Sequence, residues 1–412
     1  MNRIILCSFL LLSYGLSVCA EVRLPRFFSD HMVLQQQTSN AIWGWANPRE
    51  LIKVKSSWGA VASVKADANG KWKIFLKTPG HGTGQSLTIS GSNTIQIKDV
   101  AIGEVWLCVG QSNMGRSVAN SFEAEGESKV NLPHLRIFRS AREHWHEPLE
   151  ENRDRLSQWK RCDPKSAAET SAVAYYFGKK LHEELKIPVG IIQRAYAGTP
   201  IEGWMPKEIQ MNDPRTRANV EEEDKKSTAY DSALARKQLE RATQKWKQGK
   251  RKRKPVLRTP RNWGHQYPGN IFNGMIHPIR PYGIRGVIWY QGERNSKDVP
   301  QALNYRKQLA LLINYYRSSW HELSGGNVAK DFPFYFTQLP SWHSAQEKPV
   351  EGLEASWTVN REMMRLVDSE VANTGMVVSI DTGDAIALHP KNKKPIGIRH
   401  AYLALKLTYE KN

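Results

Sequence analysis

The stretch from Glu104 to Gly115 limits the possible folds more than any other part of the chain. Its apolar run, Val105 to Val109, predicts a buried strand that ends at Gly110, and a polar, helix-compatible segment follows. Ser112 therefore falls on a tight strand-to-helix turn at the carboxyl end of that strand. A hydroxyl there stands clear of the sheet, beside helix amides that favour a developing oxyanion. The pattern indicates either a nucleophile or a serine that caps the helix.

Residues 1–20 have the features of a secretory signal peptide. Arg3 is followed by an apolar core from Ile4 to Val18, and small residues end the segment at Ala20. A lipoprotein interpretation of Cys19 is less favoured because the bulkier Val18 precedes it. No later apolar run is long enough to cross a bilayer. We therefore expect a periplasmic or secreted protein with no membrane span.

Removal of the signal peptide leaves two of the four cysteines, Cys108 and Cys162. They could pair in an oxidising compartment. Because Cys108 lies inside the apolar strand, a buried free thiol is favoured over a disulfide.

The charge of the chain is strongly uneven. The formal net charge is +19, and residues 236–261 hold twelve Lys or Arg residues and one acid, Glu240, a net charge of +11. A nucleic-acid-binding domain favours a basic face interleaved with aromatic residues across the fold, so we expect no nucleic-acid partner. A solvated insertion or mobile lid edge is the favoured interpretation of this segment, with attraction to acidic polysaccharide as the alternative.

Residues 21–100 predict a small β-sandwich-like accessory domain. Short alternating runs are separated by turn signals, and Asp67 to Gly70 predicts a hairpin-type turn between two of the strands. The segment holds no catalytic set of side chains, so a structural role is favoured over contact with sugar.

From residue 101 to 412 the pattern becomes that of an α/β domain with a mainly parallel sheet. We expect strands at 105–109, 135–138, 189–192, 286–290, 332–339 and 376–380 and helices at 171–186, 353–367 and 396–409. A basic helical insertion at about 207–262 interrupts the alternation, with a helix expected at 231–247.

Four polar turns follow four of these strands, and they contain Ser112, Gly198, Gln291 and His389. In a parallel sheet such turns share the carboxyl edge, so distant residues can converge there. The set suits acyl transfer, in which Ser112 attacks an ester carbonyl and His389 moves the proton. The backbone amides of Ser112 and Gly198, with the side-chain amide of Gln291, then hold the oxyanion. Singly, His389 could be a loop histidine, Gly198 a turn residue and Gln291 a strand-end amide.

Several motifs resemble the sialate O-acetylesterase family of SGNH-type hydrolases. They are Gly-Gln-Ser-Asn-Met (110–114), Ala-Gly-Thr-Pro-Ile-Glu-Gly-Trp (197–204), Asn-Gly-Met-Ile-His-Pro (273–278), Trp-Tyr-Gln-Gly-Glu (289–293), His-Pro-Lys-Asn-Lys (389–393) and, near the start, Phe-Ser-Asp-His-Met-Val-Leu-Gln (28–35). The resemblance implies a flavodoxin-like three-layer α/β/α hydrolase domain with an attached β-domain. It also implies a serine esterase, with no metal or other cofactor, that releases acetate from carbohydrate. By it, Ser112 is the nucleophile, His389 the base, and Gly198 and Gln291 oxyanion contributors.

The chain departs from that family in two places. The family usually has an acid two or three positions before the histidine, where this chain has Ile386 and Ala387. Asp384 is then the tentative third catalytic residue, and the alternatives are a backbone carbonyl that supports a Ser–His dyad, or impaired activity. The family's paired glycine is Ala197-Gly198 here, which narrows the space beside the oxyanion.

The sequence thus predicts an exported carbohydrate O-acetylesterase whose partner is an acetylated glycan or sugar. Sialic acid, xylan and pectin all stay open as the sugar. The alternative is a carbohydrate-binding protein or impaired esterase on the same scaffold.

Overall fold

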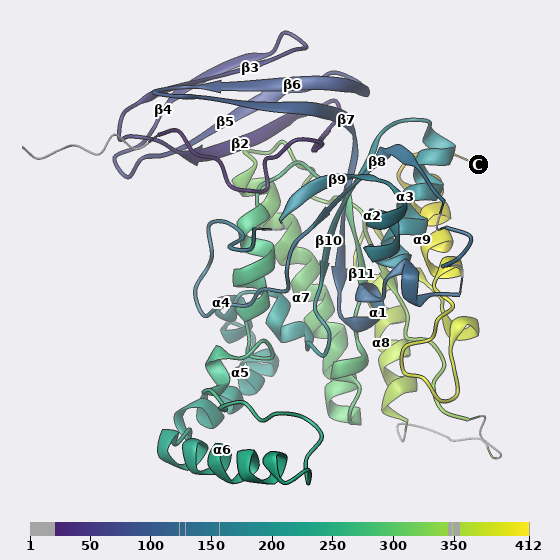
Figure 1. Ribbon diagram of the computed structural model, residues 1–412. Helices are drawn as coiled ribbons and strands as arrows, with labels where there is room; N and C mark the ends of the chain where they lie inside the picture. Colours follow the sequence, from purple (N-terminus) through teal and green to yellow (C-terminus); the bar gives the residue numbers. More distant parts are fainter. Residues whose placement is uncertain are drawn as a thin grey trace, which may run out of the picture.

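The structure is a computed structural model that describes residues 21–411 except 123, 128, 156, 345–347 and 349–354. A small β-module, formed by the first part of the described chain, lies at one end of a larger domain of strands and helices (Figure 1). The expected signal peptide, residues 1–20, lies outside the described residues. Within the described residues, no helix combines the length and apolar character that a bilayer crossing requires.

The β-module is built from two sheets. One is the antiparallel pair β2 (Ser39–Trp45) and β5 (Lys71–Lys77), and the other joins β3 (Leu51–Ser56) to β4 (Val61–Lys65) and β6 (Gly82–Ser90). The predicted turn forms at Asp67 to Gly70, where the Asp67 amide donates to the Lys71 carbonyl at 2.8 Å, but it joins no hairpin, because β4 and β5 on either side of it belong to different sheets. The turn is local, but the strand beyond it pairs with β2 instead, so the chain crosses from one sheet to the other.

One long strand joins the module to the larger domain. β7 runs from Thr94 to Gly110, pairs with β6 and with β1 (Val33–Gln35) over its first half, and continues into the central sheet. The predicted strand at 105–109 is thus the end of a much longer one. The expected domain boundary at residue 100 therefore falls inside a single continuous strand, β7.

The central sheet has the strand order β13-β12-β11-β7-β10-β8-β9. All neighbours are parallel except β9, which is antiparallel to β8 at one edge. The bounds are β8 (Leu132–Arg139), β9 (Gln158–Cys162), β10 (Val189–Ala195), β11 (Gly286–Tyr290), β12 (Phe334–Thr337) and β13 (Thr374–Val377). β11 has its predicted bounds, whereas β12 and β13 are shorter than predicted and β9 was not predicted.

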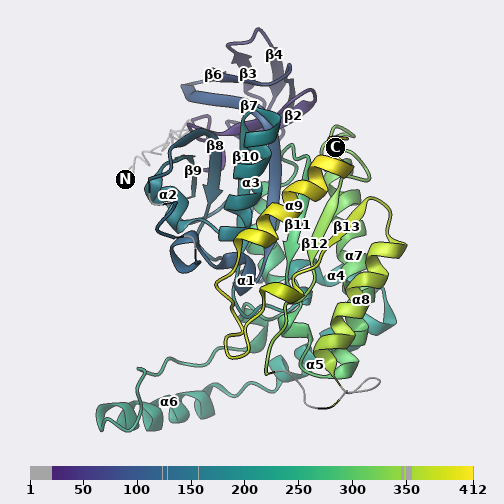
Figure 2. The same cartoon turned by 90° about the vertical axis from the view of Figure 1, so that its right-hand side faces the viewer.

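Helices cover both faces of this sheet, as the three-layer prediction requires (Figure 2). α3 (Ala172–Leu185) and α9 (Lys394–Leu407) pack on the face that presents Trp106 and Cys108 of β7. α7 (Val299–Leu323) and α8 (Ser356–Glu370) cover the opposite face, where Val105 and Leu107 point. Side chains alternate across a strand, so β7 supplies both core layers.

The helix predictions had mixed outcomes. α3 and α9 match the predicted helices at 171–186 and 396–409 to within two residues at each end. α8 continues past the predicted end at residue 367, and its predicted start at 353 lies outside the described residues. The 25-residue α7 was not predicted.

The insertion is helical over more of its length than expected. It contains α4 (Lys207–Met211), α5 (Pro214–Thr228) and α6 (Ser232–Lys247). The predicted helix at 231–247 corresponds to α6, whose N-cap is Asp231. The short helices α1 (Ser112–Gly115) and α2 (Pro164–Glu169) follow β7 and β9.

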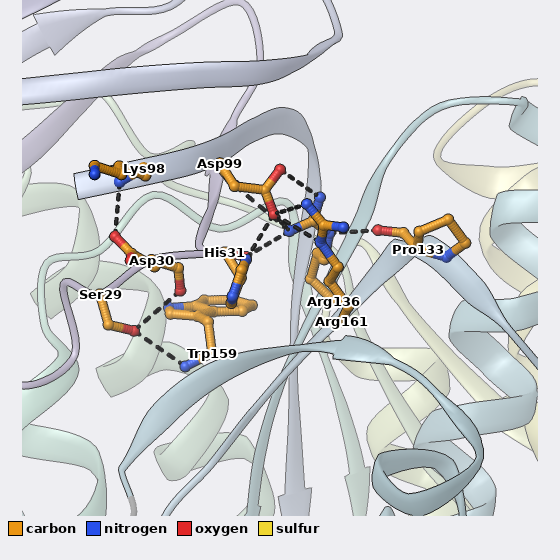
Figure 3. A network of polar contacts seen from close by, with 9 residues as sticks. All are labelled: Ser29, Asp30, His31, Lys98, Asp99, Pro133, Arg136, Trp159 and Arg161. Atoms are coloured by element: carbon orange, nitrogen blue, oxygen red, sulfur yellow. Dashed lines mark hydrogen bonds and ion pairs between the residues drawn. The ribbon is translucent and has the colours of Figure 1, made fainter.

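A cluster of charged side chains fastens the β-module to the edge of the central sheet (Figure 3). The Asp99 carboxylate, on β7, accepts hydrogen bonds from Arg136 at 2.6 and 3.2 Å and from Arg161 at 2.9 Å, and it lies 2.6 Å from His31 Nδ1. Arg136 is only 2% exposed. Although partial burial opposes ionisation, the hydrogen bonds from Arg136, His31 and Arg161 outweigh it and hold the pKa of Asp99 far below its usual value.

Cys108 and Cys162 are free and buried, as favoured above over a disulfide. Burial raises the pKa of the Cys162 thiol to about 12 and raises that of Cys108 as well. Both are therefore neutral side chains of the core.

Candidate active site

β7 ends at Gly110. Gln111 follows it, and Ser112 is then the first residue of α1. The turn is tight because Gly110 has no side chain: a Cβ there would lie 2.1 Å from the carbonyl oxygen of Tyr290. The first amides of a helix have no partner within the helix, so the backbone around Ser112 presents N–H groups at the carboxyl edge of the sheet.

His389 reaches Ser112 from the loop between β13 and α9. Its Nε2 lies 2.7 Å from Ser112 Oγ, although the two residues are 277 positions apart. Burial lowers the pKa of His389 below its ordinary value, and the charges of Lys393 and Arg116 lower it further. The imidazole is therefore neutral near pH 7, which is the form that can accept the serine proton.

These two side chains open into a cleft of about 530 Å³. Ala195 and Ala197, from the end of β10 and the turn after it, form part of its wall. Ala197, directly before the predicted oxyanion contributor Gly198, thus lines the cleft itself. Three arginines line the cleft as well: Arg116, Arg139 and Arg142.

Gly198 lies on the turn after β10, with φ at +72°, a backbone conformation that favours glycine. Its carbonyl oxygen accepts a hydrogen bond of 3.0 Å from the Gln266 side chain, which fixes the orientation of this turn.

Gln291 is fully buried just after β11. Its amide nitrogen has three acceptors: Gln111 Oε1 at 3.1 Å, the Thr199 carbonyl at 3.1 Å and Asn295 Oδ1 at 2.9 Å. An amide has only two N–H groups, so in this arrangement none is left for an oxyanion. The side chain instead ties together the turns that follow β7, β10 and β11.

Asp384 lies away from this set of contacts. Its carboxylate is exposed and accepts hydrogen bonds of 2.8 Å from the backbone amides of Ile386 and Ala387, which lower its pKa. Asp381, the other nearby acid, is paired with Arg399 at 2.6 Å. Among the described residues, no carboxylate hydrogen-bonds to His389.

A buried polar chain behind the catalytic pair was not anticipated from the sequence. The side chain of Asn113 donates to Glu293 Oε1 at 2.5 Å and accepts from Lys393 Nζ at 2.6 Å. It also donates to the carbonyl of Leu388 at 3.2 Å. Asn113 thus contacts the residue before His389, while it is itself the residue after Ser112.

The two charged residues that hydrogen-bond to Asn113 are both buried. Lys393 is 0% exposed, and burial lowers its pKa to about 7, whereas Glu293 is 8% exposed and burial raises its pKa. All three residues belong to motifs noted above, but charged residues in turns are usually solvated. The signal that could have identified them is their position immediately beside the predicted site residues.

Within the described residues, no group of three or more His, Cys, Asp or Glu side chains is placed to hold a metal ion.

Comparison with known proteins adds the family context. Residues 102–251 match the family model "Carbohydrate esterase, sialic acid-specific acetylesterase". The chain is 28% identical to sialate O-acetylesterase of Mus musculus, over 95% of this chain and 74% of that protein. It is 27% identical to the Homo sapiens protein of the same name, over 95% of this chain and 72% of that protein.

A solved structure supports the same assignment. A carbohydrate acetylesterase from Xanthomonas citri aligns with a TM-score of 0.75 and 29% identity, covering 95% of this chain and 76% of that one. Fold similarity and sequence similarity therefore agree over 95% of the chain. The chain is thus similar to sialate O-acetylesterases and to a carbohydrate acetylesterase over nearly its whole length, and these similarities indicate carboxylic ester hydrolase activity.

Proposed function

We propose that this protein is an exported serine esterase that removes O-acetyl groups from carbohydrate through Ser112 and His389. The observation that carries the proposal is the 2.7 Å contact between Ser112 Oγ and His389 Nε2 at the mouth of a cleft. That distance is within proton-transfer reach. The export part of the proposal depends on residues 1–20 and on the signal-peptide pattern alone.

In the first half of the reaction, Ser112 Oγ attacks the acetyl carbonyl while its proton passes to His389 Nε2. The bond to the sugar oxygen then breaks, and His389 returns the proton to the leaving sugar hydroxyl. This leaves acetyl-Ser112. In the second half, His389 takes a proton from water, the hydroxide attacks the acetyl-enzyme, and acetate leaves as Ser112 recovers its proton.

The oxyanion that forms in each half needs hydrogen-bond donors. We assign this role to the backbone amides of Ser112 and Gly198, because the Gln291 amide is occupied by other protein groups. Losing one such donor typically costs about 3 kcal/mol of barrier. In this proposal Gln291 holds the three turns in place and does not contact the oxyanion.

A Ser–His dyad needs another means of holding the imidazole, because Asp384 makes no contact with it. Asn113 supplies one, since it binds the carbonyl of Leu388 directly before His389. Glu293 and Lys393 in turn fix both ends of the Asn113 amide. This buried polar network therefore positions His389 through the backbone of the residue before it, whereas the acid of the usual triad positions the histidine through its ring.

The cleft favours a sugar that carries a carboxylate. Arg116 and Arg142 line it, and within the described part of the chain neither has an ion pair with an acid. Arg139 is already paired with Glu169 at 3.2 Å. Sialic acid or a uronic acid supplies a carboxylate for the two arginines without acidic partners, whereas neutral acetylated xylan does not.

The test compares wild type and Ser112→Ala on 4-nitrophenyl acetate and on acetylated sialic acid, pectin and xylan, with released acetate as the readout. We expect the variant to lose activity by about a thousandfold or more. We also expect wild type to release acetate faster from the carboxylated sugars than from xylan. Equal, slow rates for both proteins would support the alternative, a carbohydrate-binding protein that lacks esterase activity.

A further inference from the structure

The basic segment of the insertion forms an arm that stands away from the rest of the molecule. We call residues 231–261 the basic arm; it consists of α6 and the segment that returns from it. Figures 1 and 2, at right angles, both show α6 projecting from the body of the protein. Within α6 only Ala235 is buried.

The arm has a partly buried apolar side, and its returning segment contacts that side at Trp246. Leu239, Ala242 and Trp246 lie on one face of α6 and are half-buried. On the returning segment, Lys254 Nζ lies 5.8 Å from the Trp246 ring centroid, and the carbonyl of Arg258 accepts a hydrogen bond of 2.8 Å from the Tyr230 hydroxyl. The returning segment is thus held against α6 at Trp246 and against Tyr230, the residue directly before the arm.

Its cations are almost all without acidic partners. Among the described residues, Arg261 at the base of the arm is the one arm cation with a carboxylate partner, Glu223 at 2.6 Å. The eleven others have none: Arg236, Lys237, Arg241, Lys245, Lys247, Lys250, Arg251, Lys252, Arg253, Lys254 and Arg258. A folded element with such an excess of one charge attracts a polymer of the opposite charge.

The arm also lies at the functional end of the molecule. It arises between β10 and β11, at the carboxyl edge of the sheet, and both views place it at the end that carries α1, opposite the β-module. We propose that the basic arm binds a carboxylated polysaccharide and holds it at the end of the molecule that carries the catalytic cleft. This is a binding function beyond ester cleavage, although the choice of a glycan rests on the proposed function.

A nucleic acid or an anionic membrane would satisfy the same charges. We favour a glycan because the protein is a carbohydrate esterase and because the arm offers little aromatic surface for bases to stack on: Trp246 is half-covered by its own chain. The other two polymers become outcomes of the test.

The test removes five arm charges at once, with the substitutions Lys250→Gln, Arg251→Gln, Lys252→Gln, Arg253→Gln and Lys254→Gln. The matched control removes five charges from the exposed surface of the β-module, with Lys53→Gln, Lys55→Gln, Lys65→Gln, Lys77→Gln and Lys98→Gln. Both variants have the same net charge, so any difference between them depends on where the charge lies.

Binding of the full-length proteins to fluorescent polygalacturonate is measured at 50 and 200 mM NaCl. We expect the arm variant to bind about tenfold more weakly than wild type at 50 mM, and the control variant within about twofold of wild type. Affinity of wild type should fall steeply at 200 mM, and less steeply for the arm variant. Hydrolysis of 4-nitrophenyl acetate should be the same in all three proteins.

Equal losses in the two variants, or no binding by wild type, would overturn the proposal. So would tighter binding of wild type to a dT20 oligonucleotide or to phosphatidylserine vesicles than to polygalacturonate. Because binding is read without turnover, a failure of the esterase proposal would leave this result interpretable.

Discussion

The Asp99 cluster allows a stability prediction whose size follows from its contacts. Asp99→Asn keeps the shape of the side chain but removes the charge that neutralises Arg136. Since Arg136 is 2% exposed, its charge would be left buried without a carboxylate partner, with hydrogen bonds only to uncharged acceptors such as the Pro133 carbonyl. Breaking a buried pair in this way costs about 3–5 kcal/mol. We take about 3 kcal/mol, because the Asp99 side chain is 18% exposed and Asn keeps one acceptor oxygen.

That free energy converts to a measurable change in Tm. With an unfolding entropy of about 2.1 cal/mol/K per residue, the 412-residue chain has roughly 0.9 kcal/mol/K, if it unfolds as one unit. The expected fall in Tm is therefore about 3–4 °C at pH 7, by differential scanning calorimetry. Asp381→Asn is the matched control, because its pair with Arg399 is exposed and should contribute under about 1 kcal/mol.

The pH dependence has a defined sign. The pKa of Asp99 is lowered in the folded state, so its contribution is complete above the unfolded pKa, near 3.8, and is lost as the pH falls below about 4. The Tm difference between wild type and Asp99→Asn should therefore be constant from pH 5 to 7 and shrink below pH 4. Equal Tm values for Asp99→Asn and Asp381→Asn at pH 7 would refute the reasoning.

The remaining predictions concern the catalytic pair. Asp384→Asn should change kcat/KM by less than about twofold, since its carboxylate contacts only backbone amides; a tenfold loss would return Asp384 to the catalytic set. Because the pKa of His389 is lowered, the ionisation that raises kcat/KM with pH should have its midpoint below 6.5, and a midpoint above 7 for that rise would contradict the assignment. Lys393→Met should lower kcat at least about tenfold with little change in KM, because Asn113 loses a hydrogen-bond partner and the His389 loop shifts. The control is Lys391→Met, at an exposed lysine of the same loop. Equal effects of the two substitutions would argue against a positioning role for the buried polar network.

Much of the fold could be predicted because local pattern and tertiary structure agree. Gly286 to Tyr290 is apolar throughout and is buried throughout, and Asp231, where a helix was expected to begin, is the N-cap of α6. The unpredicted α7 also carries a helical period, since its buried positions Ala302, Tyr305, Leu309, Leu312 and Ile313 follow spacings of three and four. The sequence of this segment therefore contains the signal for α7.

Other features depend on contacts that no local pattern encodes. The turn at Asp67 to Gly70 has the residues of a hairpin, but β5 pairs with β2, which precedes it by about 25 positions. Lys393 lies in a polar run, yet it is fully buried because Asn113 and Glu293 meet it from two other turns. The convergence of Ser112 and His389 could be anticipated from strand polarity, whereas the partners of Gln291 and Asp384 could not.

The continuity of β7 has a practical consequence for dissecting this protein. The residues that precede Ser112 are at once the last strand of the accessory module and the central strand of the hydrolase sheet. Trimming the chain at residue 100 to obtain a minimal catalytic fragment would cut that strand in two and strip Asp99 from Arg136. The module thus supports the strand that positions Ser112. Its removal should therefore be tested for misfolding before any loss of activity is interpreted as a change in substrate preference.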